Sequence, residues 1–302
     1  MTFDEFIKRF LTEEQCEDYL YNLRWKNGFV CPKCKGTKSW KTKRLLYMCS
    51  SCSYQVSVTA GTIFQDTRKP LRNWFTAIWW VTTQKYGASA EGLQQVLGLK
   101  SYETAWAWLH KIRSAMVMPN RKKLSGTVEI DECYIGGEYV GKSGRGSENK
   151  TLVAVAVELN GKKLGRLRLE VIKDASAESF TSFITENIER GSTLITDAWS
   201  GLSGVEAEGY ERIIYKQSVA VTEDEKLPHV HLIISLLKRW LLGTHQGAVE
   251  AKYLQSYLDE YVFRFNRRTS AKRGLLFYRL LDNAMLVPPS TLNDIKVGRL
   301  LE

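Results

Sequence analysis

Two pairs of closely spaced cysteines limit what the start of this chain can fold into more than any other feature of the sequence. Each pair has two residues between its members, Cys31 with Cys34 and Cys49 with Cys52, and fourteen residues separate the pairs. Two such turns can place four thiolates tetrahedrally around one zinc ion. We therefore predict a zinc ribbon, in preference to two disulfides or a redox-active pair. Four thiolates leave no open position on the metal, so the predicted role of the zinc is structural.

The segments on either side of the cysteines have helical patterns. Apolar residues recur at helical spacing over residues 4–24, which predicts one helix. A second helical region spans residues 69–120, where Gly98 precedes a helix that begins at Ser101. Two short helices, a glycine-containing turn and a third helix match a helix-turn-helix unit, or a plain three-helix domain. If the last helix reads DNA, its contact candidates are Tyr102, His110, Lys111 and Arg113.

The charge of the chain favours a polyanionic partner. The sequence carries 43 Lys and Arg against 33 Asp and Glu, a net charge of +10, and nucleic acid is the most common partner of so basic a protein. The start of the sequence has acids where a signal peptide would have a basic segment and an apolar core, and no apolar run is long enough to span a bilayer. These observations argue against a secreted or membrane protein and predict a soluble cytoplasmic one.

The last part of the chain alternates strands and helices and carries two isolated acids. Asp131 lies inside an apolar strand over residues 127–134, and Asp197 ends a short strand over residues 193–197. The order of elements predicts a mixed α/β sheet. If the first and fourth strands are neighbours, the two carboxylates face each other, and a divalent cation such as Mg²⁺ or Mn²⁺ relieves their repulsion. Alternatively, Asp131 is a structural acid with satisfied hydrogen bonds.

Several motifs together resemble the ISXO-like transposases, the insertion-sequence group numbered fifteen-ninety-five. The resemblance covers nearly the whole chain and rests on the cysteine pairs, on Trp-rich helices, and on short motifs that are, in order, residues 61–64, 129–132, 134–137, 196–197, 229–247 and 264–268. It implies an RNase H-like catalytic domain with a DDE-type site that binds two Mg²⁺ or Mn²⁺ ions. The implied reactions are cleavage at the terminal repeats of a transposon and transfer of the freed 3′-hydroxyl into target DNA.

The third acidic position of that site is where this sequence departs from the family pattern. Asp131 and Asp197 match the first two positions, and Lys238 matches the basic residue that follows the usual glutamate. Seven residues before Lys238 stands His231, which shares a helix face with it. We therefore expect a D-D-H site of Asp131, Asp197 and His231 with Lys238 beside it, since imidazole can bind Mn²⁺. The alternatives are Asp224 or Glu225 as third ligand, or an inactive site.

The resulting expectation is a DNA transposase in three parts. Residues 1–68 form the N-terminal helix and zinc ribbon, residues 69–120 the helical DNA-binding segment, and residues 121–302 the RNase H-like catalytic domain. The expected partner is double-stranded DNA, as terminal repeats and target, bound by a homodimer or larger synaptic assembly at the nucleoid. A candidate phosphate clamp, or alternatively a solvated basic end, consists of Arg264, Arg267, Arg268, Lys272 and Arg273. The other functions considered are a catalytically degenerate, transposase-derived DNA-binding protein or regulator, and an RNA-binding ribbon protein with a nuclease-like fold.

Overall fold

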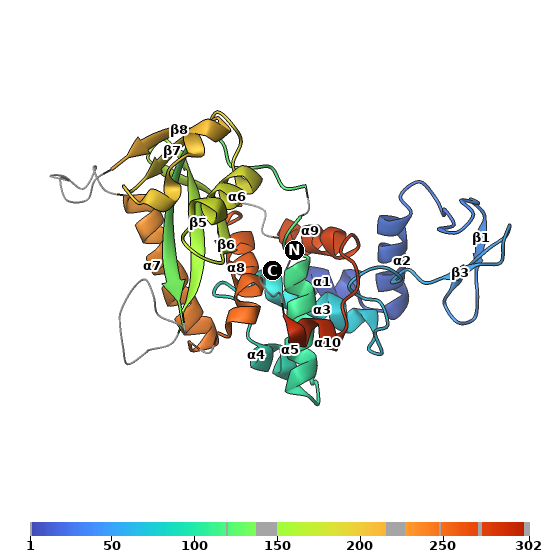
Figure 1. The fold of residues 1–302 in the computed structure, drawn as a ribbon. Helices are drawn as coiled ribbons and strands as arrows, with labels where there is room; N and C mark the ends of the chain where they lie inside the picture. Colours follow the sequence, from blue (N-terminus) through green and yellow to red (C-terminus); the bar gives the residue numbers. More distant parts are fainter. Residues whose placement is uncertain are drawn as a thin grey trace. The chain divides into compact units, whose positions relative to one another are not determined.

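The computed structural model describes residues 2–118, 120–136, 150–215, 227–247, 249–270 and 274–298. The chain divides into two compact units (Figure 1). Unit 1 comprises residues 1–118 with 270–296, and unit 2 comprises residues 119–269 with 297–302. The candidate catalytic acids and the cysteine pairs therefore lie in different units.

Unit 1 is helical apart from a small sheet. Its helices are α1 (Phe3–Arg9), α2 (Glu13–Arg24), α3 (Leu71–Thr83), α4 (Ala90–Leu97), α5 (Tyr102–Ser114), α9 (Gly274–Ala284) and α10 (Leu292–Val297). The sheet contains the antiparallel strands β1 (Ser39–Lys41), β2 (Tyr47–Cys49) and β3 (Gln55–Val56). These strands are too short to enclose a core, which is typical of a unit held together by a metal.

The single helix expected over residues 4–24 is wrong, because the structure breaks it into α1 and α2. Thr12 lies between them and caps α2: its hydroxyl accepts a hydrogen bond from the N–H of Gln15 at 3.2 Å. The Gln15 side chain in turn accepts one from the N–H of Thr12 at 3.1 Å. This reciprocal pair is a capping box, and the Thr-x-x-Gln spacing that marks it was present in the sequence.

Helix α9 returns from the far end of the sequence to complete the aromatic core of unit 1. The ring of Phe277 lies 5.6 Å from that of Phe6 and 5.5 Å from that of Phe10. The side-chain amide of Asn283 donates a hydrogen bond to the carbonyl of Ala115 at 2.9 Å. This compact division differs from the three-part organisation proposed from sequence, which placed residues 270–296 with the catalytic part.

Unit 2 is built on one five-stranded sheet. Its strands are β4 (Thr127–Ile135), β5 (Thr151–Asn160), β6 (Lys163–Val171), β7 (Thr193–Thr196) and β8 (Glu211–Ile214). Its helices are α6 (Ala177–Asn187), α7 (Pro228–His245) and α8 (Ala251–Phe265), with short 3₁₀ turns at Ser200–Leu202 and Val205–Glu208. The strand order is β6-β5-β4-β7-β8, with β4, β5 and β6 antiparallel and β7 and β8 parallel to β4. This order confirms the expected RNase H-like mixed sheet and the pairing of its first and fourth strands.

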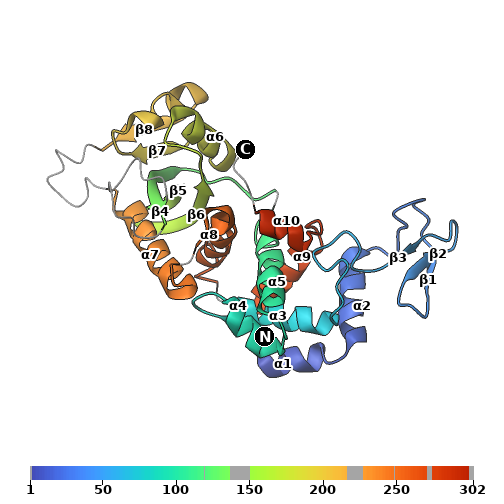
Figure 2. The ribbon, with the colours of Figure 1, turned by 60° about the horizontal axis from the view of Figure 1, so that its bottom comes forward.

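Each face of this sheet carries its own core. On one face, Cys133 and Ile135 of β4 pack with α7 and α8. On the other face, Val128 and Ile130 of β4 pack with α6. Figure 2 shows the same arrangement, with α7 and α8 on one side of the strands and α6 on the other. The alternation of β4 therefore decides which of its acids point toward α7.

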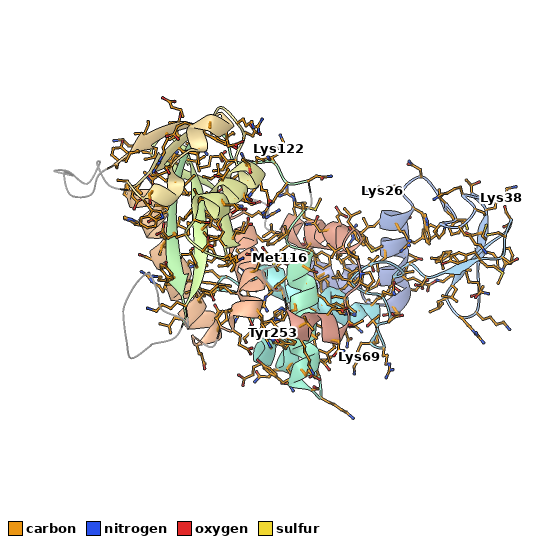
Figure 3. All side chains as sticks on the ribbon, in the orientation of Figure 1. Lys26, Lys38, Lys69, Met116, Lys122 and Tyr253 are labelled. Atoms are coloured by element: carbon orange, nitrogen blue, oxygen red, sulfur yellow. The ribbon has the colours of Figure 1, made fainter. Side chains whose placement is uncertain are left out.

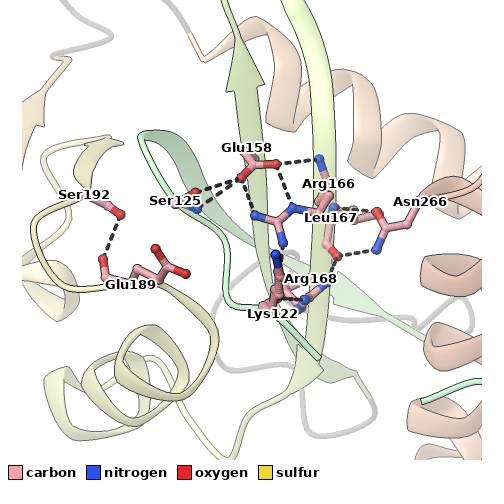
Figure 4. A network of polar contacts seen from close by, with 9 residues as sticks. All are labelled: Lys122, Ser125, Glu158, Arg166, Leu167, Arg168, Glu189, Ser192 and Asn266. Carbon is pink, nitrogen blue, oxygen red and sulfur yellow. Dashed lines mark hydrogen bonds and ion pairs between the residues drawn. The ribbon is translucent and has the colours of Figure 1, made fainter. Parts of the chain in front are cut away.

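A polar network covers the edge of the sheet at β6 (Figure 4). The carboxylate of Glu158 accepts a hydrogen bond from the guanidinium of Arg166 at 2.7 Å and from the N–H of Ser125 at 3.1 Å. The side chain of Asn266 bonds both the N–H and the carbonyl of Leu167, at 2.7 and 3.1 Å. Because these contacts satisfy groups that an edge strand leaves unpaired, the network protects the edge from pairing with another chain.

The arginines beside Asn266 have structural contacts of the same kind. Arg264 forms an ion pair with the fully buried Glu260 at 2.7 Å. Arg268 donates to the carbonyls of Leu164 and Gly165 on β6. These contacts give the motif at residues 264–268 a role in holding the end of α8 to the sheet, whereas the phosphate clamp expected there stays a prediction.

Candidate active site

Strand β4 presents its first acids to helix α7. Side chains alternate along a strand, so Glu129 and Asp131 share the face of Cys133 and Ile135, which pack with α7. The Asp131 side chain is 16% exposed, and its Oδ2 lies 3.1 Å from Nε2 of His231 on α7. The His231 side chain is 43% exposed. The structure thus brings two of the predicted site residues, Asp131 and His231, into contact at a position that is accessible to solvent.

Asp197 follows the strand that pairs directly with β4. In the parallel register, Thr127 lies opposite Thr193 and Glu129 opposite Ile195. Asp131 and Asp197 each lie two residues beyond the last of these pairs. Burial raises the pKa of Asp131, and the charge of Asp197 is close enough to raise it further. The Asp197 carboxylate accepts a hydrogen bond from the N–H of Trp199 at 3.0 Å, which holds it just beyond the end of β7. The two acids therefore lie on neighbouring strands, Asp131 in the middle of β4 and Asp197 directly after the end of β7.

The raised pKa of Asp131 shows that the ionised carboxylate is unfavourable in this environment. Burial raises this pKa to about 6, and the nearby carboxylates of Glu132 and Asp197 add to the increase. The N–H of Glu132, which donates to Asp131 at 2.8 Å, and the side chain of His231 act in the opposite direction. A half-buried carboxylate next to two other acids is an environment that a bound cation stabilises.

Lys238 lies two helical turns beyond His231 on α7. A separation of seven residues puts both side chains on one face of the helix, about 10.5 Å apart along its axis. The Lys238 side chain is exposed. Its ammonium lies close enough to β4 to lower the pKa of Cys133, which burial raises to about 12. An exposed cation therefore lies on the α7 side of the sheet, near Cys133 and the end of β4.

The donor set fits a divalent metal in its chemistry. Carboxylate oxygens with one imidazole suit Mn²⁺ and, less well, Mg²⁺. Among the described residues, however, only the four cysteines form a group of three or more metal-ligating side chains whose ligand atoms all lie within 4.8 Å of one another. Asp131 contacts His231. The Asp197 carboxylate is more than 4.8 Å from at least one of these two side chains, so the three residues do not form such a group. Asp224 and Glu225, the alternative third ligands, lie outside the described residues.

Glu129 has a structural role that the sequence did not reveal. It is 3% exposed, and its carboxylate accepts a hydrogen bond from the N–H of Val230 at 2.8 Å and contacts Nδ1 of His229 at 2.7 Å. These groups belong to the first turn of α7, which begins at Pro228. An acid at a helix N-terminus satisfies free N–H groups and stabilises the helix dipole. Glu129 thus fixes the start of α7, and with it the place of His231 opposite Asp131.

The cysteine cluster has the geometry that a zinc ion requires. Sulfur atoms of Cys31 and Cys52 are 3.7 Å apart, and those of Cys34 and Cys49 are 3.5 Å apart. Four ligands at about 2.3 Å from a tetrahedral zinc would lie about 3.8 Å from one another. Although burial works against it, N–H groups of Ser51 and Cys52 lower the pKa of Cys49 to about 6. The thiolate form of Cys49 is therefore accessible near neutral pH, whereas for Cys34, although a backbone N–H works against it, contacts with the sulfurs of Cys52 and Cys49 raise the pKa to about 12.

Positive side chains surround this cluster. Lys33, Lys35, Lys38, Lys43 and Arg44 are all exposed, and Figure 3 shows Lys38 beside β1. Lys41 instead pairs with Glu17 of α2 at 2.9 Å. Half of the Trp40 side chain is also exposed. A basic surface with an exposed aromatic ring is suited to a nucleic-acid backbone.

Two of the contact candidates on the helix-turn-helix-like segment are wrong. His110 is 7% exposed and Arg113 only 2%, and the guanidinium of Arg113 donates to the carbonyl of Ala88 at 3.2 Å. Both residues belong to the core of unit 1, on the inner face of α5. Tyr102 is 57% exposed at the start of α5 and stays a candidate contact, because recognition helices use their first turns to reach base edges.

Comparison with known proteins agrees with this arrangement in both parts of the chain. The family model described as the ISXO2-like transposase domain matches residues 123–266, and the transposase zinc-ribbon domain matches residues 11–55. A curated relative is the "Uncharacterized protein in transposable element ISH50" of Halobacterium salinarum, which is 26% identical over 89% of this chain and 95% of its own length.

Solved structures show weaker similarity. The catalytic core domain of BIV integrase is 17% identical over 49% of this chain and 86% of its own, with a TM-score of 0.34. The Mos1 strand transfer complex is 12% identical over 79% and 82% of the two chains, with a TM-score of 0.29. Separately, none of the described helices is both long and apolar enough to cross a bilayer.

Proposed function

Because the chain belongs to the ISXO2-like transposases, we propose that it cleaves DNA at the ends of an insertion sequence and joins them to a target. The observation that carries this proposal is the contact between Asp131 and His231, with Asp197 directly after β7, the strand that pairs with β4. These potential metal-binding donors come from the middle of β4, from the end of β7 and from α7. A zinc ribbon and a basic surface would supply DNA contacts away from the chemistry.

Each residue has a defined part in the proposed reaction. Asp131, Asp197 and His231 would hold two Mg²⁺ or Mn²⁺ ions, and Lys238 would contact the DNA phosphate beside them. Bound ions activate the attacking oxygen and stabilise the leaving one. Glu129 keeps α7 in place, so that His231 stays within reach of Asp131.

Two displacements at phosphorus would make up the reaction. In the first, a water oxygen attacks at the transposon end, the bond to the 3′-oxygen breaks, and a free 3′-hydroxyl results. In the second, that hydroxyl loses its proton and attacks a target phosphate, whose own bond to the 3′-oxygen breaks. Both ends of the element must be held together, so we propose that a homodimer or larger assembly acts, at the nucleoid.

The test of this function is nicking of a duplex that carries the terminal repeat bordering the gene. With Mg²⁺ or Mn²⁺ the purified protein should cut at the element end, and with a chelator it should not. Specific binding of the duplex without any metal-dependent cut would instead support a DNA-binding regulator derived from a transposase. The observation that favours this second function is that His231 occupies the position of the usual glutamate.

Replacing His231 tests its part directly. His231→Ala is expected to lower the cleavage rate about 10- to 100-fold, because the site loses one donor but keeps both carboxylates. His231→Glu restores the usual carboxylate and should retain most of the activity, with Mg²⁺ now used as well as Mn²⁺. Cleavage rates measured with each metal check this. A His231→Ala variant as active as the natural protein would show that the third ligand lies elsewhere.

Metal binding is expected to depend on pH through Asp131. Its pKa in the folded protein is raised to about 6, so below that value a metal must displace a proton. The affinity for Mn²⁺ should rise by up to about tenfold per pH unit below pH 6 and level off above it. Calorimetric titration between about pH 5 and pH 7.5 measures this change. Affinity that stays constant through this range would contradict it.

A further inference from the structure

A cavity of about 370 Å³ lies in unit 2, beyond the candidate acids along β4. Its walls come from the end of β4, the residue before β5, the second half of α7 and the segment that follows α7. The residues that matter for its chemistry are two lysines and four aliphatic side chains: Lys150, Lys238, Ile135, Leu241, Leu242 and Val249. The volume is within the range of sites that bind small molecules.

We propose that this cavity holds one unpaired nucleotide of the DNA strand that runs through the active site. The inference rests on the proposed function, because it assigns the cavity to the same DNA. It adds a binding site for a base that has left the duplex, a few nucleotides along the strand from the place of cleavage.

The charge of the cavity fits this occupant. Two of its nine described lining residues are lysines and none is an acid, so a phosphate is attracted on either side of a bound base. The aliphatic side chains offer a flat apolar contact to the face of a base, which needs no particular sequence. A larger apolar ligand would make no favourable interaction with the two lysine charges, and a free anion would make none with the apolar walls.

The position of the cavity also fits a strand leading from the acids. Four residues of β4 separate Asp131 from Ile135, or about 13 Å. Seven residues of α7 separate His231 from Lys238, or about 10.5 Å. Phosphates of one strand recur about every 3.4 Å along a duplex. The cavity therefore lies about three to four stacked nucleotides from the acids, and fewer in an extended strand.

Leu242 is the side chain most exposed to such a ligand. It is 66% exposed, whereas Leu237 and Leu241 on the same helix are buried. A leucine left open to water beside two lysines gains free energy when a base covers it. Its exposure also makes it suitable for substitution, because a polar residue there does not disturb the core.

Binding to duplexes with different ends tests the inference without any cleavage. The probes are a blunt duplex, the same duplex with a short single-stranded overhang, and the overhang duplex with its unpaired bases removed. All are measured without divalent metal and at one salt concentration. The natural protein should bind the overhang duplex on the order of tenfold more tightly than the other two. Leu242→Glu should remove this preference and leave binding to the blunt duplex nearly unchanged.

Two further variants control the result. Leu286→Glu places the same charge at a leucine of unit 1 that is 65% exposed, and it should keep the preference. Lys150→Gln should weaken binding to the overhang duplex without altering the fold. Equal binding to blunt and overhang duplexes, or equal binding with and without bases, would overturn the inference. Loss of cleavage alone would leave it intact and would count against the proposed function.

Discussion

Asp131→Asn is expected to lower the rate of metal-dependent cleavage on the order of a thousandfold. The carboxylate contacts His231, and its pKa is raised by burial and by the nearby charge of Asp197, so Asp131 is the donor that links the other two residues of the proposed site. Asparagine keeps the size of the side chain but removes the charge that holds a divalent ion. Stabilisation by bound metal amounts to several kcal/mol in the transition state, and each 1.36 kcal/mol changes the rate about tenfold. The rate of nicking of a terminal-repeat duplex measures this effect.

The fold should survive this substitution. Asp131 has a pKa raised to about 6, which means that its ionised form is unfavourable in the folded protein without metal. A neutral amide relieves that cost, so the midpoint of thermal unfolding should stay unchanged or rise. Asp18→Asn, at an exposed position of α2, is the matched control and should cleave normally. Full activity of Asp131→Asn, or an equal loss in Asp18→Asn, would contradict the proposed site.

The pairing of the two strands that carry the acids was predictable, for physical reasons. Asp131 interrupts an apolar strand and Asp197 ends another, and a carboxylate in such a place needs a partner or a cation. The pairing of β4 with β7 then follows from the order of strands and helices. The capping box at Thr12 was equally visible in the sequence, but the apolar periodicity of residues 4–24 continues across it and masks the break.

The features that could not be predicted depend on contacts between residues that are far apart in the sequence. Helical periodicity shows that α9 has an apolar face, but only the structure shows that Phe277 meets Phe6 and Phe10 in unit 1. Glu129 is separated from Val230 by about a hundred residues, so no local pattern predicts that it caps α7. The burial of Arg113 was equally unpredictable from local sequence. A basic residue on an expected recognition helix suggests an exposed DNA contact, whereas the Arg113 guanidinium donates a hydrogen bond to a carbonyl inside the core.

Cys49→Ala is expected to unfold the ribbon while leaving the rest of unit 1 folded. Strands β1 and β2 contain three residues each and β3 contains two, so the sheet has little core apart from the metal. Structural zinc contributes on the order of 10 kcal/mol to the folding of such units. Cys49 is completely buried at the end of β2, where it joins the sheet to the cluster. Bound zinc, measured by atomic absorption, should fall from about one ion per chain to nearly none.

The matched control for this loss is Cys16→Ala. Cys16 is also completely buried, but it lies on α2 and outside the cluster, so this variant should keep its zinc. Hydrogen exchange should be fast over residues 31–56 in Cys49→Ala and unchanged in the helices α3 to α5. DNA affinity should fall as well, because the exposed lysines around the cluster lose their fixed positions. A Cys49→Ala protein that retained zinc and a protected ribbon would show that the remaining three cysteines suffice, against the four-ligand site that the sulfur distances support.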